Sequence, residues 1–268
     1  MARKSNPLSS AIVIIAVIIG GLYGYHNSTK KKGEEKKYLT ELKKIHREMM
    51  MEIKTNPDVN LDKYFKKMDD LTKGMEGSEY DEFKLGGVAL QATIRHARNT
   101  QGDFEKCIDK INSKEWLDPS GLVNKRTYKA EKDVYAQLIK SCDKALKGLN
   151  TTEAEVRKAV NAVPGVSSSM KSSFLSGFCS AAKRSSKQNI TLYRYWKDYG
   201  IACHKYLEIL EQQAGNWELD TDGTILFDSD QVTVRFNKVC SEIDRIAAKV
   251  QQQADKVLKN MEQSINKL

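Results

Sequence analysis

The chain has 268 residues, of which 40% are hydrophobic and 29% are charged, and this balance excludes wholesale disorder. Only four prolines occur, so the composition favours long helices over a sheet. The net charge of +9 does not indicate a nucleic-acid partner, because +5 of it lies in residues 1–38 and the rest of the chain carries only +4. A nucleic-acid-binding domain would concentrate its basic excess on one face.

The first predicted element is a membrane-spanning helix. Residues 8–25 carry no charged side chain, and their centre is almost entirely Ile, Val, Ala and Gly. A helix of this length reaches about 27 Å, enough to cross a hydrocarbon core. A cut after Gly21 or Gly24 would leave a large residue where signal peptidase needs a small one, which favours an uncleaved signal-anchor. We therefore predict a short basic tail (1–7), a transmembrane helix (8–25), a basic juxtamembrane linker (26–37) and a helical domain (38–268).

The juxtamembrane linker bears on both lipid contact and orientation. A lysine cluster beside a membrane helix attracts anionic headgroups, or it acts only as a solvated flank that orients the anchor. The linker has more basic side chains than the tail, and by the positive-inside rule this places the domain in the cytoplasm. Short tails with a basic start usually stay inside, however, and on that ground we expect an exported, periplasmic domain. The lysines expected at the membrane surface are Lys30, Lys31, Lys32, Lys36 and Lys37.

Beyond the linker, apolar residues recur at spacings of three and four, which predicts a multi-helix bundle. Three of the four prolines fall between these patterns, where proline belongs. Thr152 with Glu155 matches a capping box, and the Gly86–Gly87 pair permits close contact with another helix. We expect helices over 34–54, 60 or 62–75, 78–100, 103–112, 120–149, 152–163, 168–184, 192–213 and 231–265.

The last predicted helix carries a heptad-like apolar seam. Such a seam is typical of a coiled coil and would supply a surface for a protein partner or for self-association. The polar residues Gln253 and Asn260 interrupt it near its end. Its members are Phe236, Val239, Ile243, Ile246 and Val250.

One stretch, about 216–227, is not helical. Apolar residues alternate on two short arms, Trp217 with Leu219 and Ile225 with Phe227, and the turn between them reads Asp-Thr-Asp-Gly. This pattern is typical of a β-hairpin. We expect a two-stranded ribbon that joins the last two helices and caps one end of the bundle.

The same turn matches part of a calcium-binding loop. Acidic residues occupy the first, third and fifth positions, and a glycine follows at the sixth. Ser229 stands where such a loop has its bidentate carboxylate, and a plain hairpin explains the same residues. The candidate ligands of this degenerate calcium site are Glu218, Asp220, Asp222 and Asp228.

Five cysteines are present, and two of them are placed to form a disulfide. Cys203 and Cys240 lie at similar distances before and after the hairpin, each on or beside the apolar stripe of its helix. If these helices pack antiparallel, the two sulfur atoms meet and could bond in an oxidising compartment. Free cysteine that fills the core is the alternative.

No catalytic constellation emerges from the sequence. Two Ser-x-x-Lys pairs lack the companion motifs of serine–lysine enzymes, and no histidine pair has a metal-binding spacing. His96 is expected to be a packed or interface imidazole. In the aromatic run of 192–210, Tyr193 and Tyr195 are expected to face solvent or a partner. The core face should comprise Leu192, Trp196, Tyr199, Cys203, Tyr206 and Leu210.

These patterns predict an all-α, single-pass, membrane-anchored interaction or structural protein of the cell envelope, without catalytic activity. Its expected partners are the lipid bilayer and another protein or a second copy of the chain, and no nucleic acid. The alternative is a ligand-binding or sensor module, with calcium in the loop 218–229 or a small molecule between helices. A cytoplasmic orientation stays open beside the exported one.

Overall fold

The structure is a computed structural model, and it describes residues 34–55, 62–114, 116–125 and 127–267. The predicted tail, the membrane segment 8–25 and most of the linker lie outside these residues. Within the described ranges, no helix is both long and apolar enough to cross a membrane. The elements are α2 (Glu34–Thr55), α3 (Asp62–Glu76), α4 (Asp81–Asn112), the 3-10 helix η1 (Pro119–Gly121), α5 (Lys129–Asn161), α6 (Ser168–Gln212), β1 (Trp217–Leu219), β2 (Ile225–Phe227) and α7 (Asp230–Lys267).

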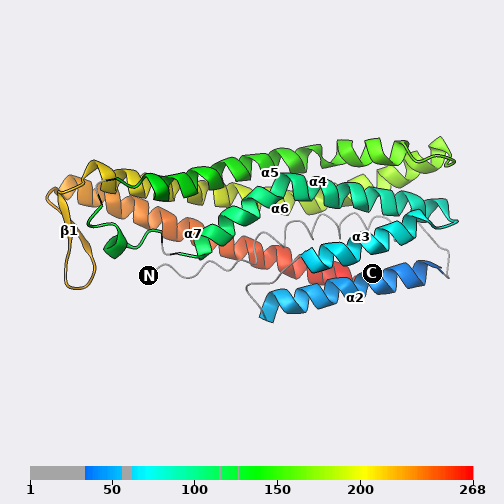
Figure 1. The fold of residues 1–268 in the computed structure, drawn as a ribbon, viewed down its shortest axis with the longest axis horizontal. Helices are drawn as coiled ribbons and strands as arrows, with labels where there is room; N and C mark the ends of the chain where they lie inside the picture. The colour runs from blue at the N-terminus through cyan, green and yellow to red at the C-terminus, as the bar shows by residue number, and fades with distance from the viewer. Residues whose placement is uncertain (1–33, 56–61, 115, 126, 268) are drawn as a thin grey trace.

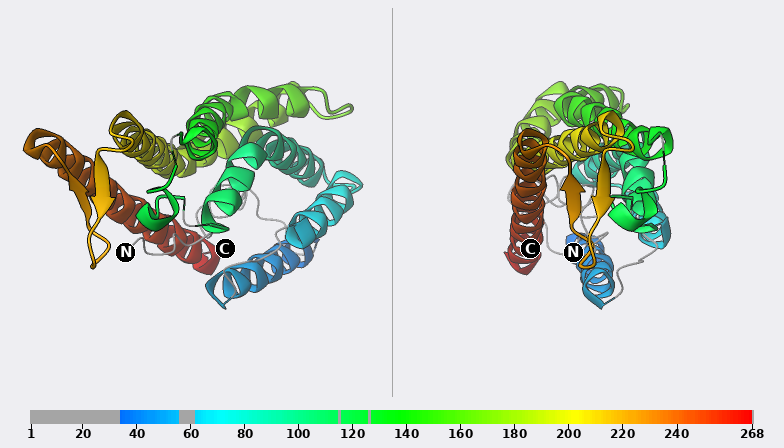
Figure 2. Two further views of the ribbon diagram at one scale, coloured as in Figure 1. Left: turned by 60° about the vertical axis from the view of Figure 1, so that its left-hand side comes forward. Right: turned by 90° about the vertical axis from the view of Figure 1, so that its left-hand side faces the viewer.

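The described residues form a predominantly helical, elongated bundle with one small antiparallel hairpin, in agreement with the predicted fold class (Figure 1). Helices α5 and α6 run side by side along the long axis, α4 packs against α5, and α7 packs against α6. The α2–α3 pair packs through α3 on α4. The hairpin lies at one end of the bundle, away from α2 and α3, as Figures 1 and 2 show.

The apolar side chains form two cores along the bundle. One lies among α2, α3 and the adjoining parts of α4 to α7, and the other lies toward the hairpin. Where α4, α5 and α6 pass from one core to the other, each contributes buried polar residues, which we name the polar belt. This layer separates the two cores, and the hydroxyls of Thr152 and Ser186 donate to carbonyls of their own helices. The polar belt comprises Gln101, Thr152, Ser186 and Asn189.

Helix α4 is continuous, so the predicted break after residue 100 is wrong. Gly102 lies inside the helix, and both Gln101 and Phe104 beside it are buried. Packing against α5 therefore outweighs the weak helix preference of glycine. The predicted start is also displaced: Ser78 accepts a hydrogen bond from the backbone N–H of Tyr80, and the helix begins at Asp81.

Helix α5 begins later and ends later than predicted. Its first turn is set by α6, because the Glu211 carboxylate accepts a hydrogen bond from the backbone N–H of Tyr128 at 3.1 Å and pairs with Lys132. The predicted capping box does not interrupt the helix. The Thr152 hydroxyl instead donates to the carbonyl of Gly148 inside the helix at 3.0 Å, a bond that competes with capping.

Helix α6 runs unbroken for 45 residues, so the predicted gap between 184 and 192 is also wrong. The polar run in this gap forms part of the helix surface and of the polar belt. The Ser186 hydroxyl donates back to the carbonyl of Ala182 at 2.9 Å, and Asn189 is fully buried. The polar run thus marks the point where α6 passes from one hydrophobic core to the other, and it does not mark the end of a helix.

The β-hairpin has the predicted arms and turn. Trp217 pairs with Phe227, and Leu219 pairs with Ile225. Gly223 adopts a φ of +77°, a conformation that side chains other than glycine rarely tolerate. Trp217 is buried in the core, and the rings of Phe227 and Phe236 lie 5.0 Å apart, which fixes the hairpin on the end of α7.

The heptad-like seam of α7 is buried within the chain. Phe236, Val239, Ile246 and Val250 all belong to the core shared with α6. Ile243 is half-buried against the same core. Because the seam packs against the protein's own α6, a surface for a partner must be sought elsewhere on the described residues.

Candidate functional site

A lysine-lined groove lies between α4 and α5 on the outside of the bundle. The two helices are antiparallel, and each contributes four residues at positions i, i+3, i+4 and i+7, which share one face of a helix. The groove has a volume of about 410 Å³. Its lining consists of Asp103, Lys106, Cys107 and Lys110 from α4, and Gln137, Lys140, Ser141 and Lys144 from α5.

One of the four lysines is neutralised inside the groove. The Nζ atom of Lys144 lies 2.6 Å from a carboxylate oxygen of Asp103, and both side chains are about half exposed. The hydrogen bond from Lys144 lowers the pKa of the Asp103 carboxyl, so this carboxylate stays ionised at neutral pH. Asp103 is the only acidic residue in the lining.

The other three lysines leave the groove with an excess of positive charge. Among the residues that the structure describes, Lys106, Lys110 and Lys140 form no ion pair with a carboxylate. The Lys110 ammonium lies 5.7 Å from the centre of the Trp116 ring, a contact that orients a cation without neutralising it. With four lysines and one carboxylate, the lining carries a net charge of +3.

The floor of the groove is less polar than its walls. Ser141 is buried, and its hydroxyl donates to the carbonyl of Leu138 at 2.8 Å. Cys107 is half-buried beside it, and burial raises the pKa of its thiol. The thiol is therefore protonated at neutral pH and does not act as a nucleophile there. The groove thus has basic walls over a floor made of a protonated thiol and a hydroxyl that is bonded to its own helix.

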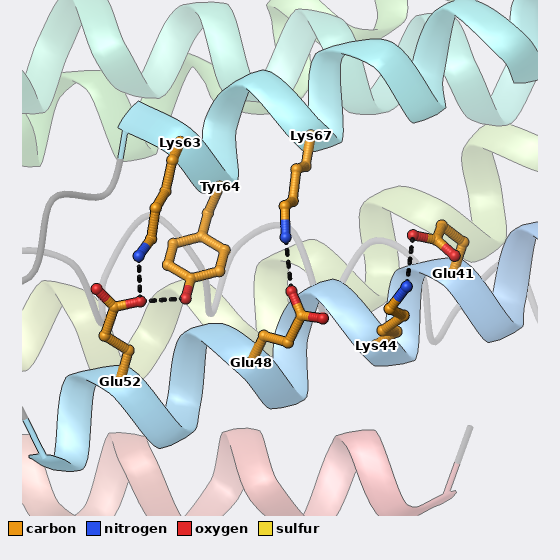
Figure 3. Close-up of polar contacts among 7 residues, drawn as sticks. All are labelled: Glu41, Lys44, Glu48, Glu52, Lys63, Tyr64 and Lys67. Atoms are coloured by element: carbon orange, nitrogen blue, oxygen red, sulfur yellow. Dashed lines mark hydrogen bonds and ion pairs between the residues drawn. The ribbon is translucent and has the colours of Figure 1, made fainter.

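The second charged surface, between α2 and α3, is neutralised (Figure 3). Glu48 pairs with Lys67 at 2.6 Å, and Glu52 accepts contacts from both Lys63 and Tyr64. These lysines lower the pKa of both glutamates. Lysines and glutamates thus satisfy each other and hold α2 on α3, in contrast with the lysine excess of the groove.

The predicted calcium loop lies at the tip of the hairpin. The Asp220 carboxylate accepts hydrogen bonds from the backbone N–H groups of Asp222 and Thr224, at 2.9 and 2.8 Å, and so closes the turn. No group of three or more His, Cys, Asp or Glu side chains in the described ranges is arranged to hold a metal ion. The calcium site at Glu218, Asp220, Asp222 and Asp228 gains no support from this geometry and stays a prediction.

All five cysteines are free thiols in this structure, and the disulfide between Cys203 and Cys240 stays a prediction. Cys203 is fully buried, and burial raises the pKa of its thiol. Cys240 is half-buried on α7, and burial raises the pKa of its thiol to about 11. Cys203 thus lies in the core that α6 shares with α7, and Cys240 packs against the same core.

Tyr193, Tyr195 and His96, three residues for which the sequence gives an expectation, are all buried or half-buried. Tyr193 is fully buried, with its ring 4.8 Å from that of Phe104, so the prediction that it faces solvent or a partner is wrong. Helix α4 covers it. Tyr195 is half-buried, and Lys249 lies over its ring. His96 packs between α4 and α5, where its Nε2 atom lies 2.9 Å from the carbonyl oxygen of Gly148.

Sequence reasoning missed a buried histidine in α2. His46 has no exposed surface, and its Nδ1–H donates to the carbonyl of Leu42 at 2.9 Å. Its Nε2 atom is buried and has no hydrogen-bond partner among the residues that the structure describes. Burial lowers the pKa of this imidazole to about 4. The helical position of His46 beside Leu42 and Ile45 was the available signal, because both belong to the same buried stripe.

Comparison with known proteins adds no family to this description. No protein-family model, no curated protein and no solved structure matches the chain. The functional class therefore rests on the fold and on the groove alone.

Proposed function

We propose that the chain is a membrane-anchored helical binding module without catalytic activity, which binds a negatively charged ligand or partner. The apolar segment 8–25 would hold it in the bilayer, with the lysines of 26–37 at the lipid surface. The tail's basic start supports an exported domain. On this proposal the helical bundle is a scaffold, and its function is to bind the ligand or partner.

The lysine excess of the α4–α5 groove carries this proposal. Lys106 and Lys140 stand on opposite walls, with no carboxylate partner among the described residues to neutralise them. Uncompensated charge of one sign in a concave surface attracts ligands of the opposite sign. The α7 seam, in contrast, is occupied by α6, which favours the groove as the binding surface.

The groove also supports a second candidate function, a ligand-binding or sensor module that binds a small molecule between its helices. Pockets that bind small molecules often lie between the helices of a bundle, and the groove volume of about 410 Å³ falls in their range. A binding module and a ligand sensor share this first step. In a sensor, ligand binding would also change contacts between helices away from the groove, such as the contacts of α2, whereas in a simple binding module it would not.

Lysine reactivity tests the proposal in the full chain. We expect Lys106 and Lys140 to react more slowly with an amine-directed reagent in intact cells than in the purified, ligand-free protein, because a bound anion shields them. Lys183 and Lys205, exposed on α6 outside the groove, serve as controls and should react equally in both states. Equal reactivity of Lys106 and Lys140 in the two states, measured by peptide mass spectrometry, would contradict the proposal.

A further inference from the structure

We infer that the α4–α5 groove binds a small, multiply charged oxyanion of the phosphate-ester class. This inference rests on the proposed function and narrows it to a chemical class of ligand. Three features of the lining support it: the kind of charged group, the shortage of free acceptors and the size of the groove.

The positively charged groups of the groove are all lysines. A lysine ammonium is a compact charge with three donors on a flexible stem, whereas arginine offers a planar fork that pairs with one carboxylate or phosphate edge. The lining contains no arginine. Several lysines around one space suit an anion that spreads two or more charges over oxygen atoms pointing in different directions, as a phosphate ester or a pyrophosphate does.

The groove offers many donors and few acceptors. Lys106, Lys110 and Lys140 donate only, and one oxygen of the Asp103 carboxylate accepts from Lys144. The remaining acceptors are the other Asp103 oxygen, the amide oxygen of Gln137 and the Ser141 hydroxyl oxygen. The Ser141 hydroxyl already donates to Leu138, so its hydrogen is not available to a ligand. A neutral polyol could use these acceptors, but it carries no charge to interact with the four lysine ammonium groups. A ligand composed mainly of acceptor oxygens matches the lining.

The dimensions of the groove favour a small ligand over a folded partner. Its volume of about 410 Å³ accommodates a small metabolite or a lipid headgroup. A stable protein interface instead needs roughly 800 Å² of surface on each partner. Both a free phosphate ester and a phospholipid headgroup carry the required chemistry, so the test must distinguish these two sources.

Isothermal titration of the full chain in neutral detergent tests the class. We expect sodium pyrophosphate to bind, and the double variant Lys106→Gln/Lys140→Gln to weaken binding about tenfold, since each exposed ion pair contributes a modest amount. The matched variant Lys183→Gln/Lys205→Gln removes the same charge from α6 and should bind as the wild type does. Raising the salt from about 0.05 M to about 0.3 M should weaken binding by screening. Circular dichroism establishes that both double variants are folded.

The comparison titrants decide the class and the source. Succinate, a dicarboxylate of lower charge, should bind at least about tenfold more weakly than pyrophosphate. If water-soluble dihexanoyl phosphatidic acid binds more tightly than pyrophosphate, and the groove lysines are required, the phosphate belongs to a lipid headgroup. If it does not, the phosphate belongs to a soluble ligand.

Two failures have different meanings. If pyrophosphate and dihexanoyl phosphatidic acid show no lysine-dependent binding while Lys106 and Lys140 stay protected in cells, the phosphate class is overturned and the proposed function stands, with an acidic peptide as the next probe. If protection in cells is absent as well, the proposed function fails together with the class.

Discussion

Replacing Gly87 with alanine should lower the free energy of unfolding by about 2 kcal/mol, the cost typical of overpacking a tight contact. A Cβ atom at this position would lie 2.7 Å from the carbonyl oxygen of Thr72 and 2.9 Å from the backbone nitrogen of Glu76. Both are backbone atoms of α3, so no side-chain rotation relieves the clash. Helix α3 would have to move away from α4, and the core between them would open.

Gly102→Ala is the matched control for this prediction. Gly102 lies in the interior of the same helix, and an added Cβ there meets nothing within 4 Å. Alanine should therefore raise stability by up to about 1 kcal/mol through its better helix propensity. Urea unfolding followed by circular dichroism measures both variants. The close α3–α4 contact would be refuted if Gly87→Ala proved as stable as Gly102→Ala.

The second large effect is a loss of stability in mild acid that comes from His46. The folded state keeps this imidazole neutral down to a pKa of about 4, whereas the unfolded chain binds a proton near 6.5. A lowered histidine pKa contributes its full stability above pH 6.5 and loses it as the pH falls toward 4. Between pH 6.5 and 4.5 we expect a loss of about 2 to 3 kcal/mol from this one residue.

The variant His46→Leu isolates the contribution. Leucine fits an apolar stripe and has no proton to bind, so the stability of this variant should depend less on pH between 6.5 and 4.5 than that of the wild type. The lowered pKa values of Glu48 and Glu52 affect both proteins alike and mainly at lower pH. Parallel pH profiles for the two proteins, from urea unfolding at several pH values, would show that His46 is not the source.

The elements of the fold could be predicted where local pattern and tertiary environment agree. The hairpin follows from alternating apolar residues around an Asp-Thr-Asp-Gly turn, and both requirements are local. Helix ends were harder to predict because distant residues set them. Helix α5 starts where Glu211, from the far end of α6, binds the backbone N–H of Tyr128. No property of residues 120–130 alone indicates this contact.

The polar belt explains why single helices were divided in the prediction. From the sequence, polar residues such as Gln101 and Ser186 predict gaps between helices, yet they lie inside α4 and α6 at the boundary between two cores. The sequence pattern shows only that the apolar stripe of a helix is interrupted. Whether the chain turns there or passes into a second core depends on the neighbouring helices.

The groove could not be predicted because it requires the pairing of two helices. Each of its stripes, at 103–110 and 137–144, looks like an ordinary solvated helix face. The two stripes form a groove only because α4 continues through Gly102 and packs antiparallel on α5. Two lysine-rich stripes with the same spacing were the available signal, and the predicted break in α4 obscured it.

Photo-crosslinking in intact cells tests most directly whether the groove is a binding site. A photoreactive amino acid in place of Gln137, which is exposed at the groove, should give a covalent adduct detectable as added mass on the full chain. The same residue in place of Glu155, exposed on α5 outside the groove, is the control. We expect the adduct at 137 to disappear when Lys106→Glu and Lys140→Glu are added, because a reversed charge repels an anion. No adduct at 137 beyond that at 155, or an adduct that survives the charge reversal, would contradict a lysine-dependent binding site.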